Sequence, residues 1–350
     1  MANRRAFLCT CAGACACTIA QGEGAKEAEH VGLQNVDRYR VVEPMFEALR
    51  VVLNYRGEPY SPAYIQGISG AAFRFGGPCP CAPTCSVSRQ PPELVRLLGY
   101  EATEAILGWR DDDVSAEMQA LIPRIKESLR AGRPVPVWHA FTTAEWDVVA
   151  GYDDAKGVFL GGGSSAGLDE YAEAPQTRAQ EATKICPAFG ALFIGKKTGP
   201  FDARAAELSA LREAVRHARD RTETHTPGRP DLEGLRAYDR WTAKFQQPGA
   251  KRAGGDSYCH GVYRTTHRAA GDFLREIAPH YEPAKEPLLA AARAFHAEAD
   301  ALDSAGKLIG WESPTEDAGR NEKLWPILAR ARDHYARGVA EVEKALASVG

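Results

Sequence analysis

The sequence contains no long hydrophobic run and has little net charge. No stretch of about 18 or more consecutive apolar residues occurs, and a helix that spans a bilayer needs roughly 20 of them. The formal net charge is only −3, so the chain lacks the strongly basic surface that is typical of nucleic-acid-binding proteins. We therefore expect no transmembrane segment in the mature chain and no nucleic-acid partner.

The bulk composition is that of a globular protein. Hydrophobic residues make up 44% of the chain and charged residues 25%, which excludes intrinsic disorder as the general state. The 350 residues are enough for two domains of ordinary size.

The first twenty residues differ from the rest of the chain. Arg4 and Arg5 precede the uncharged run 6–20, which ends in small residues. This order is typical of a secretory signal, and the arginine pair is similar to a twin-arginine signal. We expect residues 1–20 to be removed and the protein to be exported to the periplasm or the extracellular space. The alternatives are a buried N-terminal helix and a lipid anchor on Cys17.

Three of the nine cysteines lie in one loop rich in glycine and proline. Cys79, Cys81 and Cys85 have the spacing C-x-C-x3-C, and thiolates so placed could hold a soft metal ion such as zinc or Cu(I). A fourth ligand would come from Cys186, Cys259 or a histidine. The alternative is one or two disulfides, or a free thiol, in an exported loop.

Hydrophobic periodicity divides the chain into an α+β half and a helical half. A flexible lead is expected over 21–40, an α+β domain over 41–199 and an all-α helical domain over 200–350. In the α+β domain the pattern predicts helices over 43–55, 62–68, 92–98 and 113–131, with strands near 102–106, 135–141, 146–152, 158–160 and 188–194. In the helical domain it predicts a five-helix bundle, with helices near 208–215, 232–245, 258–277, 288–302 and 324–346.

The start of the first helix is a place where hydrolases often keep a nucleophile. Glu43 stands at or next to the N-cap, and Pro44 occupies a position of the first turn where proline is tolerated. The positive end of a helix dipole would stabilise a cysteine thiolate there. The sequence, however, has no cysteine at this position.

Four segments carry a resemblance to a known family. They are LRVVLNYRG at 49–57, GISGAAFRF at 67–75, GRPV at 132–135 and WDVVAGYDD at 146–154. Together they resemble the papain-like N-terminal domain of butirosin-biosynthesis protein H and its relatives, over roughly residues 40–195. The resemblance implies a papain-like domain, built of helices and an antiparallel sheet, followed by a helical extension.

The catalytic groups that this resemblance implies are missing. A papain-like enzyme needs a thiolate, an imidazole and a group that orients the imidazole. The thiol position falls on Glu43 or Pro44 and the imidazole position on Glu145, while the strand at 158–160 ends without Asp or Asn. We therefore expect a degenerate domain without catalytic residues, whose old cleft binds an unidentified small molecule or peptide.

The candidate residues of this cleft come from the first helix and the central hairpin: Glu43, Trp138, His139, Glu145, Trp146 and Asp147. Paired carboxylates at 43 and 145 could act as acid and base, or bind a cation or an amine. The alternative is that Glu43 only caps its helix, that Glu145 is a strand-edge residue and that His139 is a packed strand histidine.

Two further functions are compatible with the sequence. One is a cysteine-dependent acyltransferase or peptidase-like enzyme whose nucleophile has moved to the loop with Cys79, Cys81 and Cys85. The other is a metal-handling protein built around that loop.

Overall fold

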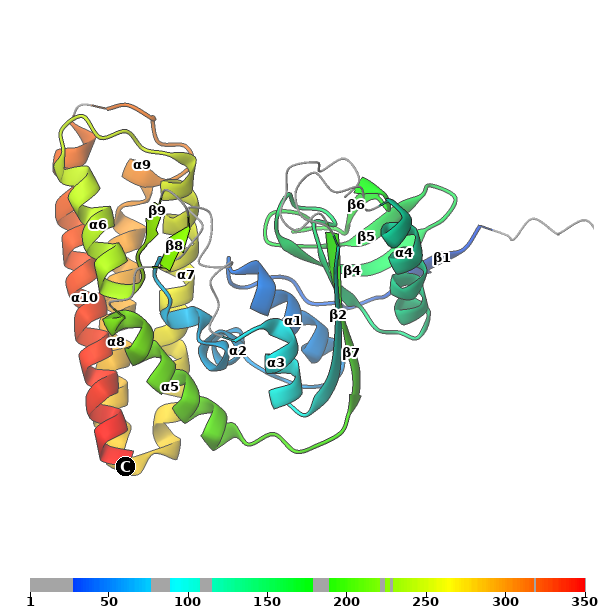
Figure 1. Ribbon diagram of the computed structural model, residues 1–350, viewed down its shortest axis with the longest axis horizontal. Coiled ribbons are helices and arrows are strands. Elements are labelled where there is room, and N and C mark those ends of the chain that lie inside the picture. Colours follow the sequence, from blue (N-terminus) through cyan, green and yellow to red (C-terminus); the bar gives the residue numbers. More distant parts are fainter. Residues whose placement is uncertain are drawn as a thin grey trace, which may run out of the picture.

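The computed structural model has the predicted α+β organisation, with an antiparallel sheet followed by a helical region (Figure 1). It describes residues 28–76, 89–107, 115–178, 189–220, 224–226, 229–317 and 319–349. The predicted signal at 1–20, the loop cysteines Cys79, Cys81 and Cys85, and Cys186 lie outside the described residues.

Seven of the described strands form one sheet in which every pairing is antiparallel. The order across the sheet is β2-β7-β3-β4-β5-β6, and β1 also pairs with β4. The strands are β1 (His30–Gly32), β2 (Tyr100–Leu107), β3 (Val135–Trp138), β4 (Trp146–Asp153), β5 (Val158–Gly162), β6 (Ala172–Pro175) and β7 (Phe189–Lys197).

Helices cover both faces of this sheet. One face is packed by α1 and α3, and the other by α4 (Figure 1). The helices of this part are α1 (Pro44–Tyr55), α2 (Pro62–Ser69), α3 (Pro91–Leu97) and α4 (Ser115–Arg130). Each face has its own apolar core: Leu49 of α1 and Val148 of β4 belong to one, and Ile125 of α4 and Val149 of β4 to the other. The split follows from the alternation of side chains along a strand.

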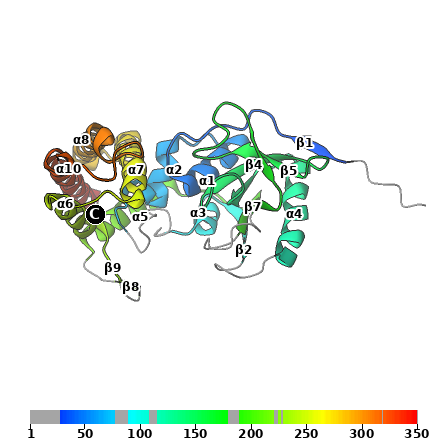
Figure 2. The ribbon, with the colours of Figure 1, turned by 90° about the horizontal axis from the view of Figure 1, so that it is seen from above.

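The C-terminal half is a bundle of long helices that packs beside α2 (Figure 2). Its helices are α5 (Ala203–Arg219), α6 (Gly234–Gln246), α7 (Gly254–Ile277), α8 (Lys285–Ser304), α9 (Gly306–Ile309) and α10 (Arg320–Val349), with a small hairpin of β8 (Thr224–Thr226) and β9 (Arg229–Asp231) between α5 and α6. The core on the α1 face continues into this bundle as one apolar cluster. No helix in the described ranges is long and apolar enough to cross a membrane.

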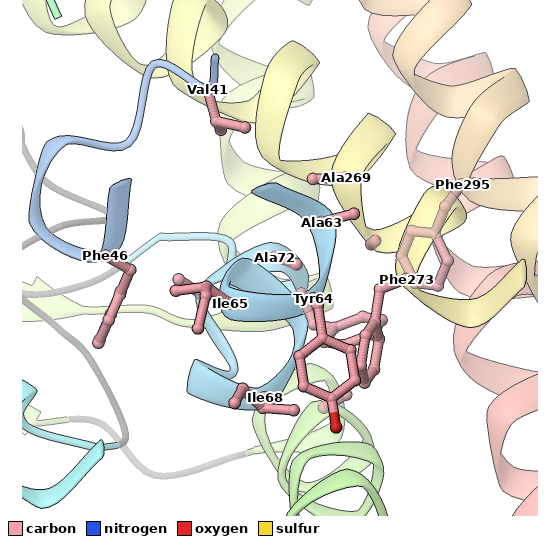
Figure 3. Packing of buried hydrophobic residues seen from close by; sticks show 14 of the residues in the cluster. Val41, Phe46, Ala63, Tyr64, Ile65, Ile68, Ala72, Ala269, Phe273 and Phe295 are labelled. Atoms are coloured by element: carbon pink, nitrogen blue, oxygen red, sulfur yellow. The ribbon is translucent and has the colours of Figure 1, made fainter. Parts of the chain in front are cut away.

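Helix α2 joins the two halves because it packs closely against α7. Ser61 caps its N-terminus and Gly70 ends it in a left-handed conformation with φ of 83°. Tyr64 of α2 meets Phe273 of α7 edge to face, with ring centroids 5.8 Å apart (Figure 3). A Cβ atom on Gly67 would lie 2.1 Å from the ring of Phe273, so glycine is required for this approach.

The segment 73–76, which follows a 3₁₀ turn at Ala71–Phe73, is inserted into the bundle. The ring of Phe75 stacks between Tyr238 of α6 and Tyr263 of α7, with centroid distances of 3.8 and 4.1 Å. Side chains of the bundle also form hydrogen bonds with the backbone of the segment. Two of them donate to its carbonyl groups: Tyr335 Oη to Phe73 and His267 Nε2 to Arg74. Two others accept from its N–H groups: His217 Nε2 from Phe75 and Tyr263 Oη from Gly76.

The N-terminal part of the domain differs from the flexible lead expected over 21–40. Residues 30–32 form β1, which pairs with β4 from Gly151 to Asp153. The sequence does not predict this strand, because three residues in a polar stretch are too few to show an alternating pattern of apolar and polar side chains. The short β6 is missing from the sequence prediction for the same reason.

Substitution of Gly67 by alanine should destabilise the protein strongly. The added methyl group overlaps the Phe273 ring, and overpacking of this kind typically costs about 1–3 kcal/mol or more. Gly261 of α7 is the matched control, because a Cβ atom added there would have nothing within 4 Å, and Gly261→Ala should stabilise the helix by about 0.5–1 kcal/mol. Urea unfolding measures the change in the free energy of unfolding for both variants. Equal effects of the two substitutions would contradict the proposed close contact.

Candidate functional site

Glu43 is the N-cap of α1 and is buried. Its side chain is 1% exposed. Oε2 accepts hydrogen bonds from the backbone N–H of Phe46, at 2.8 Å, and from Nε2 of Gln66, at 3.1 Å. Pro44 follows as the first helical residue, where the missing N–H costs nothing. Glu43 therefore occupies the position that the resemblance assigns to a nucleophile, and it caps its own helix there.

Burial raises the pKa of Glu43 to about 7, although the bonds from Phe46 and Gln66 favour the charged form. Oε1 of Glu43 and Oε1 of Gln66 are buried and have no hydrogen-bond partner among the described residues. A protonated Glu43 carries one donor, and Gln66 offers one unused acceptor on the amide that Glu43 already contacts. We infer that Glu43 and Gln66 form an acid–amide pair when the carboxyl is neutral.

Glu145 lies at the end of the hairpin loop before β4. Ser164 Oγ donates a hydrogen bond to its Oε2, and the Tyr258 hydroxyl of α7 bonds to the same carboxylate. Burial raises its pKa. Glu145 is thus held between a loop of the sheet and the helical half.

Tyr39 lies close to both candidate carboxylates. Its hydroxyl donates to the carbonyl of Trp146 at 2.8 Å. Burial raises the pKa of this phenol well above its usual value, and the carboxylates that raise it further are Asp147, Glu47, Glu145 and Glu43. These side chains still do not make a metal site: within the described ranges no three His, Cys, Asp or Glu side chains are grouped to hold an ion.

His139 is a turn residue. It follows β3 with φ of 66°, and its Nδ1 accepts the backbone N–H of Ala144 at 2.9 Å. Burial, and then the nearby Arg178, lower its pKa to about 4. Its imidazole is therefore neutral and its Nδ1 already occupied, so it shapes the hairpin.

The remaining hairpin candidates lie on opposite faces of the sheet. Trp138 and Trp146 are register partners whose rings meet edge to face, 5.9 Å apart. Asp147 is paired with Val137 and so belongs to the other face. Its Oδ2 accepts the backbone N–H groups of Phe141 and Thr142, and burial raises its pKa to about 7. Asp147 therefore holds the hairpin loop rather than joining the two tryptophans.

Cys259 of α7 belongs to the described residues, and its thiol is not activated. Burial raises its pKa to about 11, against a smaller effect of a hydrogen bond with Tyr263. A protonated thiol packed in a helix interface is a poor nucleophile.

A cavity of about 390 Å³ lies beside this region, on the α1 face of β4. One wall is the segment 34–39, the floor is Val148 and Ala150, and the other wall is the loop 162–171. Tyr171 Oη donates to the carbonyl of Leu33 at 2.8 Å and so links the two walls.

The rim of this cavity carries apolar side chains and, on balance, acidic ones, since exposed Arg38 contributes one positive charge against Asp169 and Glu170. Leu168 is 52% exposed and Tyr171 36% exposed, although both are large apolar side chains. Asp169 and Glu170 between them are exposed and make no ion pair with any other described residue. Asp37 also lines the cavity but is paired with Arg50 at 2.7 Å.

Sequence reasoning misses this cavity. Both walls lie in stretches without hydrophobic periodicity, for which the sequence predicts a lead and a flexible connection. The available signal is Leu168 and Tyr171, two large apolar residues in a segment otherwise rich in Gly, Ser and acidic residues.

No protein-family model matches the sequence, and no curated protein is significantly similar to it. The arguments on function therefore depend on the site itself.

The stability of the protein should depend on pH through Glu43. Because its folded pKa, about 7, exceeds the unfolded value of 4.5, its contribution is fully present below about pH 4.5 and is lost as pH rises toward 7. Glu43→Gln keeps a cap and a partner for Gln66 without titrating. Relative to wild type, this variant should gain up to about 3 kcal/mol between about pH 4.5 and pH 8.

Urea unfolding at about pH 5 and about pH 8 measures this difference. Glu43→Ala should be less stable than Glu43→Gln at both pH values, by about 1 kcal/mol or more, because the cap is lost. Glu286→Gln, an exposed residue of the first turn of α8, is the control and should change little. The same stability difference between wild type and Glu43→Gln at both pH values would refute the raised pKa.

Proposed function

We propose that this is an exported, non-catalytic binding protein that holds a small molecule or peptide in the cavity beside Tyr39. The observation that carries the proposal is the 390 Å³ cavity itself; the proposal is also supported by Glu43, a buried helix cap at the position to which the resemblance assigns a nucleophile. A volume of this size is within the range of ligand sites, and the lining combines apolar with polar and charged residues.

Two of the candidate residues, Glu43 and His139, make structural contacts that support a non-catalytic role for them. A pKa near 7 would suit Glu43 for proton transfer, but the side chain is 1% exposed and caps its helix. The Nδ1 atom of His139 is occupied by Ala144. Glu43 thus serves as a helix cap and His139 Nδ1 as an acceptor within its turn.

The rim indicates the ligand class. Leu168 and Tyr171 offer exposed apolar surface, and Asp169 and Glu170 lie between them along the loop. An apolar group and a positive charge on one ligand would satisfy both features. The proposed ligand is therefore an organic amine or a peptide with an apolar side chain and a cationic group.

Calorimetric titration with three related probes tests this proposal. Phenylalanine amide is cationic, N-acetylphenylalanine amide is neutral, and N-acetylphenylalanine is anionic. The cationic probe should bind most tightly of the three. The double substitution Asp169→Asn/Glu170→Gln should weaken its binding about fivefold to tenfold, since exposed charge pairs contribute up to about 1 kcal/mol each. Glu286→Gln/Glu322→Gln removes two exposed carboxylates elsewhere and should leave binding unchanged.

A second pair of variants tests the apolar part of the rim. Leu168→Ala should weaken binding of the cationic probe. Ile106→Ala, which removes a side chain that is 44% exposed on β2, should leave this binding unchanged. Mass spectrometry of each probe after incubation with the protein should show an unchanged mass. Equal binding of the three probes, no binding of the cation, or chemical conversion of a probe would each count against the proposal.

Export is tested with a reporter that must fold before transport. A fusion of residues 1–40 to such a reporter should reach the bacterial periplasm, because the twin-arginine route carries folded cargo. Arg4→Lys/Arg5→Lys in the same fusion should keep the reporter inside the cell, and Arg38→Lys/Arg40→Lys should not. A reporter that stays inside with the unchanged segment would remove the export part of the proposal.

A further inference from the structure

A second cavity, of about 530 Å³, lies at the other end of α1 from Glu43. It is lined by the residue that ends α1, by α4 and the loop after it, and by β2 and β7: Arg56, Glu101, Thr103, Arg124, Glu127, Ser128, Arg133, Phe193, Ile194, Gly195 and Lys196. Nothing proposed for the first cavity bears on this site.

The lining of this cavity has an excess of positive charge. Lys196 is paired with Glu101 at 3.7 Å. Arg56, Arg124 and Arg133 form no ion pair with any carboxylate of the described residues, and Glu127 is the one other acid in the lining. In a chain with a net charge of −3, three guanidinium groups without an ion-paired carboxylate at one cavity are a local exception; Glu58, which also acts on the charge of Arg56, is ion-paired with Lys197.

Arg56 is fixed by the sheet rather than by an acid. The pairing of β3 with β7 ends at Ala191, so β7 carbonyls beyond that point lack a strand partner on this side. The guanidinium of Arg56 donates to the carbonyls of Ile194, at 2.6 Å, and Gly195, and lies 5.0 Å from the ring centroid of Tyr100. This arrangement holds its charge in place without cancelling it.

The like charges affect one another. Burial lowers the pKa of Arg56, and the nearby Arg133 lowers it further. Arg124 lies over the ring of Phe193, with its guanidinium carbon 4.6 Å from the centroid. Such a contact orients the planar group and leaves its N–H donors available. The hydroxyl of Thr103 lies in the same lining.

We propose that this cavity binds a phosphate monoester of a small molecule. A doubly charged group with three acceptor oxygens matches this lining better than a single carboxylate does, because Arg124 and Arg133 can each donate two parallel hydrogen bonds and Arg56, bonded to β7, adds a third positive charge. The ring of Phe193 provides apolar surface for the organic part. Binding of the dianion would neutralise the repulsion between Arg56 and Arg133.

Titration with phenyl phosphate, at constant ionic strength, tests the proposal. Benzoate is the matched probe, with the same ring and one negative charge. The double substitution Arg124→Gln/Arg133→Gln should weaken the binding of phenyl phosphate at least about tenfold, since two charge-assisted contacts are lost. Arg56 is left in place because it bonds the sheet. Arg212→Gln/Arg330→Gln removes two exposed arginines elsewhere and should retain wild-type affinity.

Urea unfolding of both double variants establishes that they are folded, so that lost binding is assigned to the cavity. Tighter binding of phenyl phosphate than of benzoate, lost only in Arg124→Gln/Arg133→Gln, supports the site. The proposal is overturned if wild type does not bind phenyl phosphate, if benzoate binds equally well, or if both double variants lose affinity to the same extent.

Discussion

The insertion of Phe75 between two bundle tyrosines is the contact on which the arrangement of the two halves depends. Its ring is 2% exposed and lies nearly parallel to Tyr238, with an interplanar angle of 10°, and at 23° to Tyr263. Stacked aromatic pairs contribute about 0.5–1.5 kcal/mol each beyond the burial of their surface. The segment that carries Phe75 has one short backbone partner, an antiparallel bridge between Gly76 and Glu233 with the Gly234 N–H donating to the Phe75 carbonyl at 2.7 Å, and side chains bond its other backbone groups. They do so from α5, α7 and α10, and the position of the α+β half is therefore specified by polar as well as apolar contacts.

A buried, hydrogen-bonded histidine–glutamate pair lies next to this contact. His267 Nδ1 is 2.7 Å from Glu298 Oε1, and neither side chain is exposed. Burial disfavours the charged imidazole, but the carboxylate of Glu298 outweighs this effect and raises the pKa of His267. The other ring nitrogen bonds to the carbonyl of Arg74. Such a pair adds little net stability compared with apolar residues of the same volume. Its contribution is to specificity, because a shifted segment would leave the buried His267 ring without its bond to the Arg74 carbonyl.

Much of the fold can be predicted from local patterns of apolar residues, capping residues and proline in the sequence. The cavity beside Tyr39 cannot be predicted in this way. The sequence predicts that the first helix begins at Glu43 and Pro44, because a capping residue and proline are unambiguous signals, and α1 begins there. The bundle helices are predictable because long apolar periodicity survives any tertiary context. The strand β1 and the cavity beside Tyr39 depend on long-range pairing: residues 30–32 become a strand only because β4, more than a hundred positions later, offers an edge. No short window of sequence contains that information.

The carboxyl group of Glu43 shows how burial and capping compete at one atom. A negative charge at a helix N-terminus is favoured by about 0.3–1 kcal/mol, and by more in partly buried geometries, and the bonds from Phe46 and Gln66 act in the same direction. The pKa nevertheless rises from 4.5 to about 7, a net shift of roughly 3 kcal/mol toward the neutral form. Desolvation therefore outweighs the hydrogen bonds that favour the charged carboxylate. A thiol at this position would meet the same desolvation, which also raises the pKa of a buried thiol. The environment around residue 43 thus favours a neutral group that can donate to Gln66, and this is a physical reason why the helix start suits a cap better than an activated nucleophile.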